Sequence, residues 1–141
     1  MKKLLAILVL GLLLNSCAPP PDYNADSRIN KWTFEEKLAK VNSARLLLLE
    51  TGMSKSQVFD IMGTEAAHAI NNPYDVSLFT SGKDSITVIY YYTNWARMGS
   101  TCIVCPHHLK PIILLNGKLK GWGNEALRRA VDQYDLEINI D

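Results

Sequence analysis

The sequence predicts the α+β class, with two N-terminal helices packed on a small, three-stranded antiparallel sheet and a helix at the C-terminus. Three observations predict this fold. A short helix between Gly52 and Gly63 carries start and stop signals at its ends. Residues 85–94 are rich in the β-branched and aromatic side chains that favour strands. Asn116-Gly117 is a strong hairpin signal, because a type I′ turn needs positive φ at both central positions.

The composition is that of one globular domain with appendages. Of the 141 residues, 48% are hydrophobic and 21% are charged, which argues against a disordered chain. The formal net charge is only +1, and no basic run provides an electrostatic footprint for nucleic acid. We therefore expect no nucleic-acid partner.

The first residues have the features of a secretion leader. Lys2 and Lys3 precede an apolar run over residues 4–14, which has the length of a signal-peptide core. A membrane-spanning helix would need about 20 apolar residues. The next segment, Leu14-Asn15-Ser16-Cys17, resembles the lipobox of bacterial lipoproteins. The alternative is an ordinary secretory signal followed by a structural cysteine.

The lipobox resemblance implies that residues 1–16 are removed and that Cys17 carries lipid. Several acyl chains, palmitate among them, give stable membrane anchoring where a single chain does not. Ala18 follows in place of aspartate, which by the same resemblance implies the periplasmic face of the outer membrane. Residues 17–32 are then a proline-led linker, and residues 33–141 are the folded domain.

The first helix is predicted to begin at a capping box formed by Thr33 and Glu36 and to run to about Glu50. Its apolar stripe has helical spacing, with Arg45 laying its stem along it, and comprises Leu38, Val41, Arg45 and Leu48 or Leu49. Residues 46–49 are leucines on every side of the helix. Either this turn is buried between elements or part of it is a contact surface.

A second, two-turn helix follows a helix-stop-helix corner. Ser54 and Gln57 form its capping box, and Gly63 stands where a positive-φ residue would end it. Gly52 ends the preceding helix in the same way. The second helix has one apolar stripe, made of Val58, Ile61 and Met62.

The sheet is predicted from residues 85–94, 111–115 and 118–122, with a short edge strand also conceivable around Val76, Leu78 and Phe79. Side chains of the first strand alternate between two faces. We expect the N-terminal helices to cover the face with Ile86, Val88, Tyr90 and Tyr92. Residues 97–110 are predicted to be a long loop.

The C-terminal helix is predicted to start with Asn124 as its cap. Its apolar positions have helical spacing and are Leu127, Ala130, Val131 and Tyr134. Residues 136–140 alternate with period two, which fits either a terminal strand or a tail.

The corner and the hairpin resemble the SmpA/OmlA (BamE-like) lipoprotein domain over residues 38–123. The resemblance is carried by Gly52-Met53-Ser54, Val58, Gly63, the aromatic pair Tyr90 and Tyr92, and the Leu-Leu-Asn-Gly-Lys-Leu segment at residues 114–119. It implies a non-catalytic scaffold in the cell envelope, with outer-membrane protein assembly machinery as the partner. No cofactor is expected for that function.

The predicted loop contains Cys102-Ile103-Val104-Cys105-Pro106-His107-His108. In an oxidising compartment a Cys102–Cys105 disulfide is the default interpretation. A second one is a zinc or copper site formed by Cys102, Cys105, His107 and His108. A third is a redox-active thiol pair, although Pro106 and a following strand replace the helix that normally lowers a thiol pKa.

Two functions follow. The first is the membrane-anchored scaffold, not an enzyme, whose candidate interaction surface is Ile89, Tyr91 and Trp95 on the sheet face away from the N-terminal helices. The C-terminal helix covering these three residues is the alternative. The second function is a periplasmic metal- or redox-binding lipoprotein that uses the cysteine–histidine loop.

Overall fold

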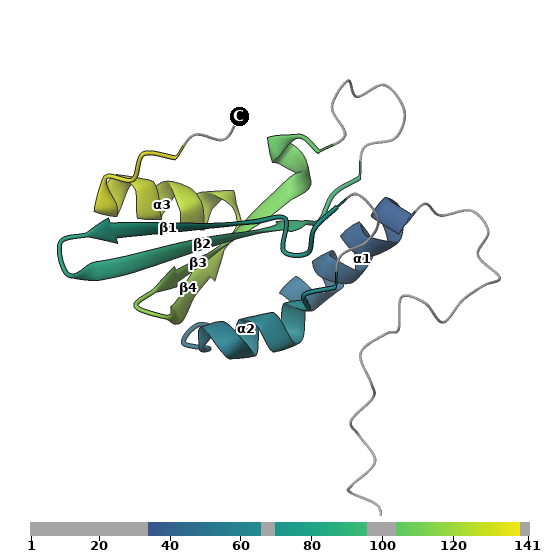
Figure 1. The fold of residues 1–141 in the computed structure, drawn as a ribbon, viewed down its shortest axis with the longest axis horizontal. Helices are drawn as coiled ribbons and strands as arrows, with labels where there is room; N and C mark the ends of the chain where they lie inside the picture. Colours follow the sequence, from purple (N-terminus) through teal and green to yellow (C-terminus); the bar gives the residue numbers. More distant parts are fainter. Residues whose placement is uncertain (1–33, 66–69, 96–103, 139–141) are drawn as a thin grey trace, which may run out of the picture.

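The computed structural model describes residues 34–65, 70–95 and 104–138. The elements, in chain order, are α1 (Phe34–Leu46), α2 (Lys55–Met62), β1 (Asp75–Ser81), β2 (Asp84–Tyr92), the 3-10 helix η1 (Pro106–His108), β3 (Leu109–Leu115), β4 (Lys118–Trp122) and α3 (Asn124–Tyr134). Figure 1 shows them as helices around one sheet, which confirms the predicted α+β class. The predicted leader, the linker, Cys17 and Thr33 lie outside the described residues.

None of the helices in the described ranges has the length and hydropathy needed to cross a bilayer.

The sheet has four antiparallel strands in the order β1-β2-β3-β4, so the prediction of three strands is wrong. The additional strand is β1, which pairs with β2 without interruption from Asp75 opposite Tyr90 to Ser81 opposite Asp84. Its residues, Asp-Val-Ser-Leu-Phe-Thr-Ser, have a weak strand signal by themselves. The strand forms because the strongly β-prone β2 offers it a complete row of backbone partners.

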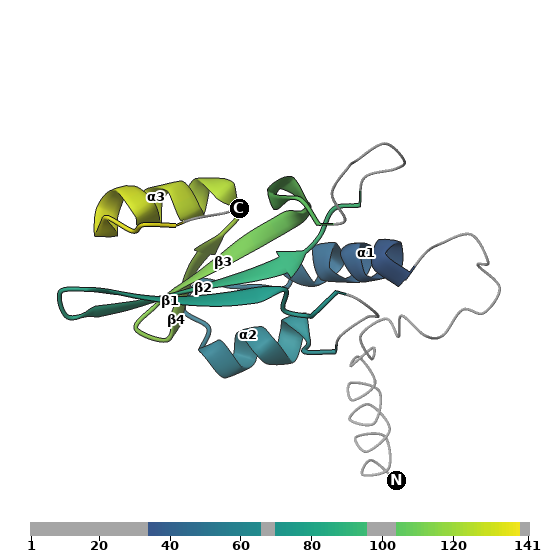
Figure 2. The same cartoon turned by 45° about the horizontal axis from the view of Figure 1, so that its top comes forward.

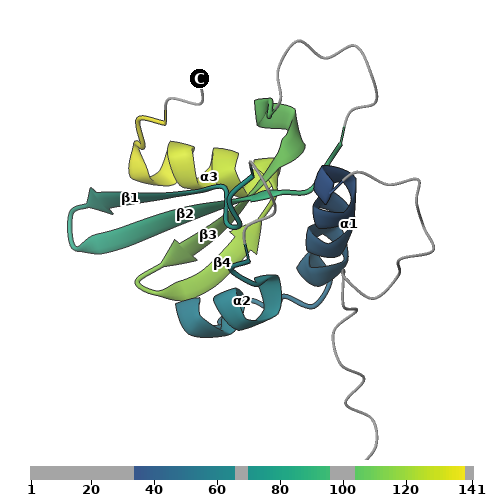
Figure 3. The ribbon, with the colours of Figure 1, turned by 45° about the vertical axis from the view of Figure 1, so that its right-hand side comes forward.

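Helices cover both faces of the sheet (Figure 2), which corrects the predicted assignment of the faces. The face with Ile86, Val88 and Tyr90 packs mainly against α3, whereas Ile89 and Tyr91 on the opposite face pack against α2. We name these the α3 face and the α2 face. The first helix lies at the end of the sheet (Figure 3) and contributes to both clusters, through Leu38 and Ala39 on one side and Leu46 on the other.

The corner before α2 folds as predicted. The hydroxyl of Ser54 accepts a hydrogen bond from the Gln57 N–H at 3.3 Å, and the Gln57 side chain accepts one from the Ser54 N–H at 2.8 Å. Gly63 ends the helix with a φ of 77°, and Val58 and Met62 are fully buried. These local signals suffice because each acts within four residues.

The same corner is hydrogen-bonded to the β3–β4 hairpin, which no local signal predicts. The Gly52 N–H donates to the Leu119 carbonyl at 2.8 Å, the Leu119 N–H donates to the Met53 carbonyl at 2.7 Å, and the Lys55 N–H donates to the Gly117 carbonyl at 3.1 Å. This backbone ladder holds α2 against the sheet and places residues 52–55 along the outer edge of β4.

The first helix ends at Leu46, four residues earlier than predicted, and its buried side consists of Leu38, Ala39, Asn42 and Leu46. The leucines that follow differ in exposure: Leu49 is buried, whereas Leu47 and Leu48 are exposed. The burial of Asn42 was not predicted, because a polar side chain does not contribute to the apolar periodicity from which buried positions are inferred. Its amide donates to the Asn72 side-chain oxygen at 2.9 Å and to the Tyr92 carbonyl at 2.8 Å, which joins α1 to the segment before β1 and to the end of β2.

The C-terminal half follows the prediction with one correction, which concerns the cap of α3. Asn116 and Gly117 have φ values of 51° and 77°, so the hairpin turn is confirmed. The cap of α3 is Gly123 and not Asn124, which is the first helical residue. The predicted apolar side of α3 does pack on the sheet, with Ala130 buried. Residues 136–138 form no strand, and residues 139–141 lie outside the described part.

Candidate functional site

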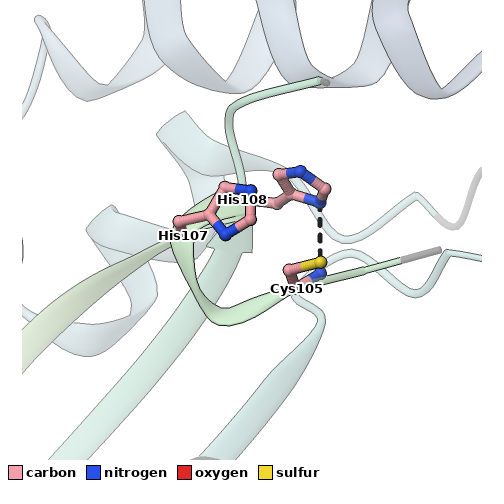
Figure 4. Close-up of side chains that lie close together, drawn as sticks. All are labelled: Cys105, His107 and His108. Carbon is pink, nitrogen blue, oxygen red and sulfur yellow. Dashed lines mark hydrogen bonds between the residues drawn. The ribbon is translucent and has the colours of Figure 1, made fainter. Parts of the chain in front are cut away.

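A cysteine and two histidines meet where the chain enters β3 (Figure 4). Pro106 opens the single turn of η1, because its fixed φ suits the first position of a helix. The His108 N–H then donates to the Cys105 carbonyl at 2.8 Å, and the Cys105 N–H donates back to Nδ1 of His108 at 3.1 Å. This reciprocal pair closes the turn of η1, within the segment that the sequence predicted as a long loop.

His108 is integrated in the core of the domain. It is 2% exposed, and its ring stands edge-on to Tyr92 with centroids 5.8 Å apart. Its backbone carbonyl accepts hydrogen bonds from the N–H groups of Thr93 and Asn94, at 2.9 and 3.2 Å, which ties η1 to the end of β2. Burial, and secondarily the neighbouring His107, hold the pKa of His108 below its usual value of 6.5.

The protonation of His108 follows from these contacts. The ring is neutral at physiological pH, and because Nδ1 accepts a hydrogen bond, the proton is on Nε2. Among the described residues, Nε2 has no hydrogen-bond partner. Because Nδ1 accepts the hydrogen bond from the Cys105 N–H, its lone pair points toward Cys105, as Figure 4 shows.

Three of the four predicted metal ligands come together. One donor atom each from Cys105, His107 and His108 lies within 4.8 Å of the other two. The two adjacent rings do not diverge, as adjacent side chains in a strand would, because the helical turn brings their centroids to 4.2 Å at an interplanar angle of 70°. His107 is exposed, Cys105 is half-buried and His108 is buried.

Cys105 is disulfide-bonded, and its partner lies outside the described ranges. Cys102 also lies there, so the Cys102–Cys105 pairing stays a prediction. As long as the disulfide is intact, the Cys105 sulfur is not a thiolate and is a poor metal ligand.

The predicted interaction surface is wrong for two of its three residues. Ile89 and Tyr91 are fully buried under α2, and the Tyr91 hydroxyl donates to the Gly63 carbonyl at 3.0 Å. Trp95 is half-buried and packs against the cluster of the α3 face. The alternative also needs correction, since α2 and not the C-terminal helix covers Ile89 and Tyr91.

An exposed apolar surface lies instead along β1 and the residue that precedes it, where the sequence predicted no interaction surface. Tyr74, Val76 and Leu78 are 38%, 38% and 70% exposed. They occupy alternate positions, and the pairing of Val76 with Ile89 and of Leu78 with Thr87 places them on the α2 face. Strand β1 makes its extensive contacts with β2, whereas the helices contact the other strands. The alternation of Tyr74, Val76 and Leu78 was the available signal.

The two edges of the sheet differ. Strand β4 carries Lys118 and Lys120. The pairing of β4 with β3 shifts register after Ile113. Residues 52–55 lie along the outer edge of β4 and are hydrogen-bonded to the hairpin. Charge, irregular pairing and a covering segment are the usual devices that prevent strand addition. The β1 edge carries a single charge, that of the exposed Asp75 at its first residue; it pairs regularly over all seven residues and contains no lysine or proline. We call it the open edge.

The comparisons with known proteins identify a family without a known activity. A family model described as "Protein of unknown function (DUF3192)" matches residues 22–129, more than half of the chain. No curated protein and no solved structure matches significantly. Nothing in these comparisons links the chain to the SmpA/OmlA domain, so that resemblance stays a sequence-based prediction. The chain belongs to the DUF3192 family, whose function is unknown.

Proposed function

We propose that the chain is a non-catalytic, lipid-anchored protein of the cell envelope that binds an extended segment of a partner protein at the open edge. The observation that carries the proposal is the contrast between the two sheet edges. Strand β4 is charged and covered, whereas β1 presents a regular row of backbone groups beside the exposed side chains of Val76 and Leu78.

Strand addition explains how such an edge can give both affinity and specificity. The backbone of a partner strand would hydrogen-bond to the outward N–H and C=O groups of β1, and its alternate side chains would extend the α2 face. There they would lie next to Val76 and Leu78, whose apolar surface is removed from water on binding. We therefore expect the bound segment to be extended and to have apolar residues at every second position.

The place of action is proposed from the sequence. The lipobox at Cys17 and the following Ala18 support anchoring on the periplasmic face of the outer membrane. The likeness of the corner and the Asn116-Gly117 hairpin to the SmpA/OmlA domain supports a role beside the outer-membrane assembly machinery. The proline-led linker over residues 17–32 would hold the folded domain away from the bilayer.

A photo-crosslinking amino acid at Leu78, introduced into the full-length protein in cells, tests this surface. We expect a protein adduct from Leu78, because its side chain is 70% exposed beside the open edge. The same amino acid at Leu47, which is 84% exposed but lies outside β1, is the matched control and should give no adduct of comparable yield. Equal yields from the two positions would contradict docking at β1.

Two further variants divide the proposal into its parts. Val76→Lys places a charge on the open edge and should abolish the Leu78 adduct. Because the site is on the surface, the free energy of unfolding of this variant should differ from that of the wild type by no more than about 0.5 kcal/mol. Cys17→Ala removes the proposed lipid site and should move the protein to the soluble fraction and lower the adduct yield. A Leu78 adduct that survives Val76→Lys refutes strand addition; unchanged membrane fractionation of Cys17→Ala refutes the anchor alone.

A further inference from the structure

The donor set at the entrance to β3 suits a borderline transition-metal ion. It combines one cysteine sulfur, from Cys105, with the imidazole nitrogens of His107 and His108. Zinc in proteins is held by this mixture of thiolate and imidazole, and hard cations such as magnesium are not. No acidic oxygen belongs to the cluster that the described residues form. The chemistry of the donors thus selects zinc-type ions over magnesium and calcium.

The geometry requires little movement. Donors bound tetrahedrally to zinc at about 2.0–2.3 Å lie roughly 3.3–3.6 Å from one another. The three donor atoms lie within 4.8 Å before any ion is bound. His107 can close this difference because it is exposed, whereas His108 is fixed by burial and by the contact of its ring with Tyr92. One side chain of the cluster is thus pre-positioned, and a second can adjust to it.

The tautomer of His108 is also the one that a metal needs. Nδ1 has the free lone pair of the neutral ring and already points toward Cys105, where it accepts the Cys105 N–H at 3.1 Å. A cation at this position would take over the lone pair and leave the proton on Nε2. The Cys105 N–H and the ion compete for the same Nδ1 lone pair. Metal binding therefore needs a second strong ligand, which the Cys105 thiolate provides.

We propose that this cluster is a redox-gated zinc-type site: the chain binds the ion through Cys105 Sγ, His107 and Nδ1 of His108 only when the Cys105 disulfide is reduced. A dithiol reductant supplies the two electrons and two protons. It becomes a cyclic disulfide, and Cys105 and its partner cysteine become thiols. Cys105 then releases its proton to solvent as the sulfur binds the ion. In the reverse direction a cyclic disulfide is the oxidant: it takes the two electrons, together with one proton from the partner thiol and one from solvent, and becomes a dithiol, while the Cys105 disulfide re-forms and the metal is released.

Zinc titration of the full-length protein in detergent tests the proposal. One sample is reduced with a dithiol that is then removed under anaerobic conditions, and the other sample keeps its disulfide. We expect the reduced chain to bind about one zinc ion and the oxidised chain to bind none at the same concentrations. Equal binding by both samples, or no binding by the reduced sample, overturns the proposal. This comparison uses one sequence, so it does not depend on the folding of a variant.

Two variants assign the ligands. His107→Ala should keep the fold, because His107 is exposed, and should weaken zinc binding by more than the roughly 10–100-fold lost when a group that only orients a ligand is removed. With cobalt as a spectroscopic probe, the thiolate charge-transfer band of the reduced protein should disappear in Cys105→Ser. An unchanged affinity in His107→Ala, or a band that persists in Cys105→Ser, refutes this ligand set.

Discussion

Replacing Tyr91 with alanine is expected to lower the free energy of unfolding by about 3–5 kcal/mol, as for other large aromatic residues in protein cores. Tyr91 is fully buried on the α2 face among Val58, Met62 and Ile112, so truncation leaves a cavity between α2 and the sheet. Urea denaturation followed by circular dichroism measures the change. Tyr74→Ala is the control: because Tyr74 is exposed, this variant should lose far less free energy of unfolding. A small effect of Tyr91→Ala would contradict the placement of α2.

The Tyr91→Phe variant isolates the hydroxyl group. Its loss removes the hydrogen bond to the Gly63 carbonyl and should cost about 1 kcal/mol at neutral pH. Burial raises the pKa of Tyr91 above its usual value of 10.0, with a smaller lowering by Arg45 and raising by Glu65. The unfolded chain therefore loses this proton first. The contribution of the tyrosine is complete below about pH 10 and declines as the pH rises further. The difference between wild type and Tyr91→Phe should then narrow above pH 10; a constant difference would contradict the buried hydroxyl.

Gly63→Ala is expected to lower the free energy of unfolding by about 2–4 kcal/mol, for two reasons. The first is backbone strain, since a φ of 77° with a ψ of 165° is a conformation for glycine. The second is steric, because a Cβ at this position would collide with the guanidinium of Arg45 and the carboxylate of Glu65. Moving Arg45 breaks its 2.8 Å hydrogen bond to the Met62 carbonyl at the end of α2.

Gly52→Ala is the matched control for this variant. Gly52 also has a positive φ, of 94°, but a Cβ there would meet nothing within 4 Å. Gly52→Ala should therefore lower the free energy of unfolding only by the backbone strain, about 1–3 kcal/mol. The unfolding free energy of the two variants, measured side by side, separates strain from collision. An equal loss in both would show that Arg45 moves away without cost.

The sequence predicted those parts of the fold that depend on neighbours in the chain. The capping box of Ser54 and the Asn116-Gly117 turn act over a few residues, and both are confirmed. The alternation in β2 correctly separated Ile86 and Val88 from Ile89 and Tyr91. It could not tell which helix covers which face, because that depends on the backbone bonds from residues 52–55 to the hairpin. The predicted surface was wrong for this reason.

The other features that the sequence left open or did not indicate also depend on partners far away in the chain. Strand β1 has little intrinsic preference, and its formation depends on pairing with β2. Asn42 is buried because its amide meets Asn72, thirty positions away, and the Tyr92 carbonyl. For the cysteine–histidine cluster the residue types were sufficient to suggest metal ligands. The closeness of His107 to His108 was not predictable, since it follows from the helical turn of η1.

Amide hydrogen exchange of residues 75–81 tests the central claim, strand addition at the open edge, most directly. In an edge strand, alternate backbone N–H groups point outward and are unpaired. The account predicts that these alternate amides exchange rapidly in the purified full-length protein and slowly in the protein kept in its native membranes, with little change in β3. Identical exchange of β1 in both preparations would contradict it.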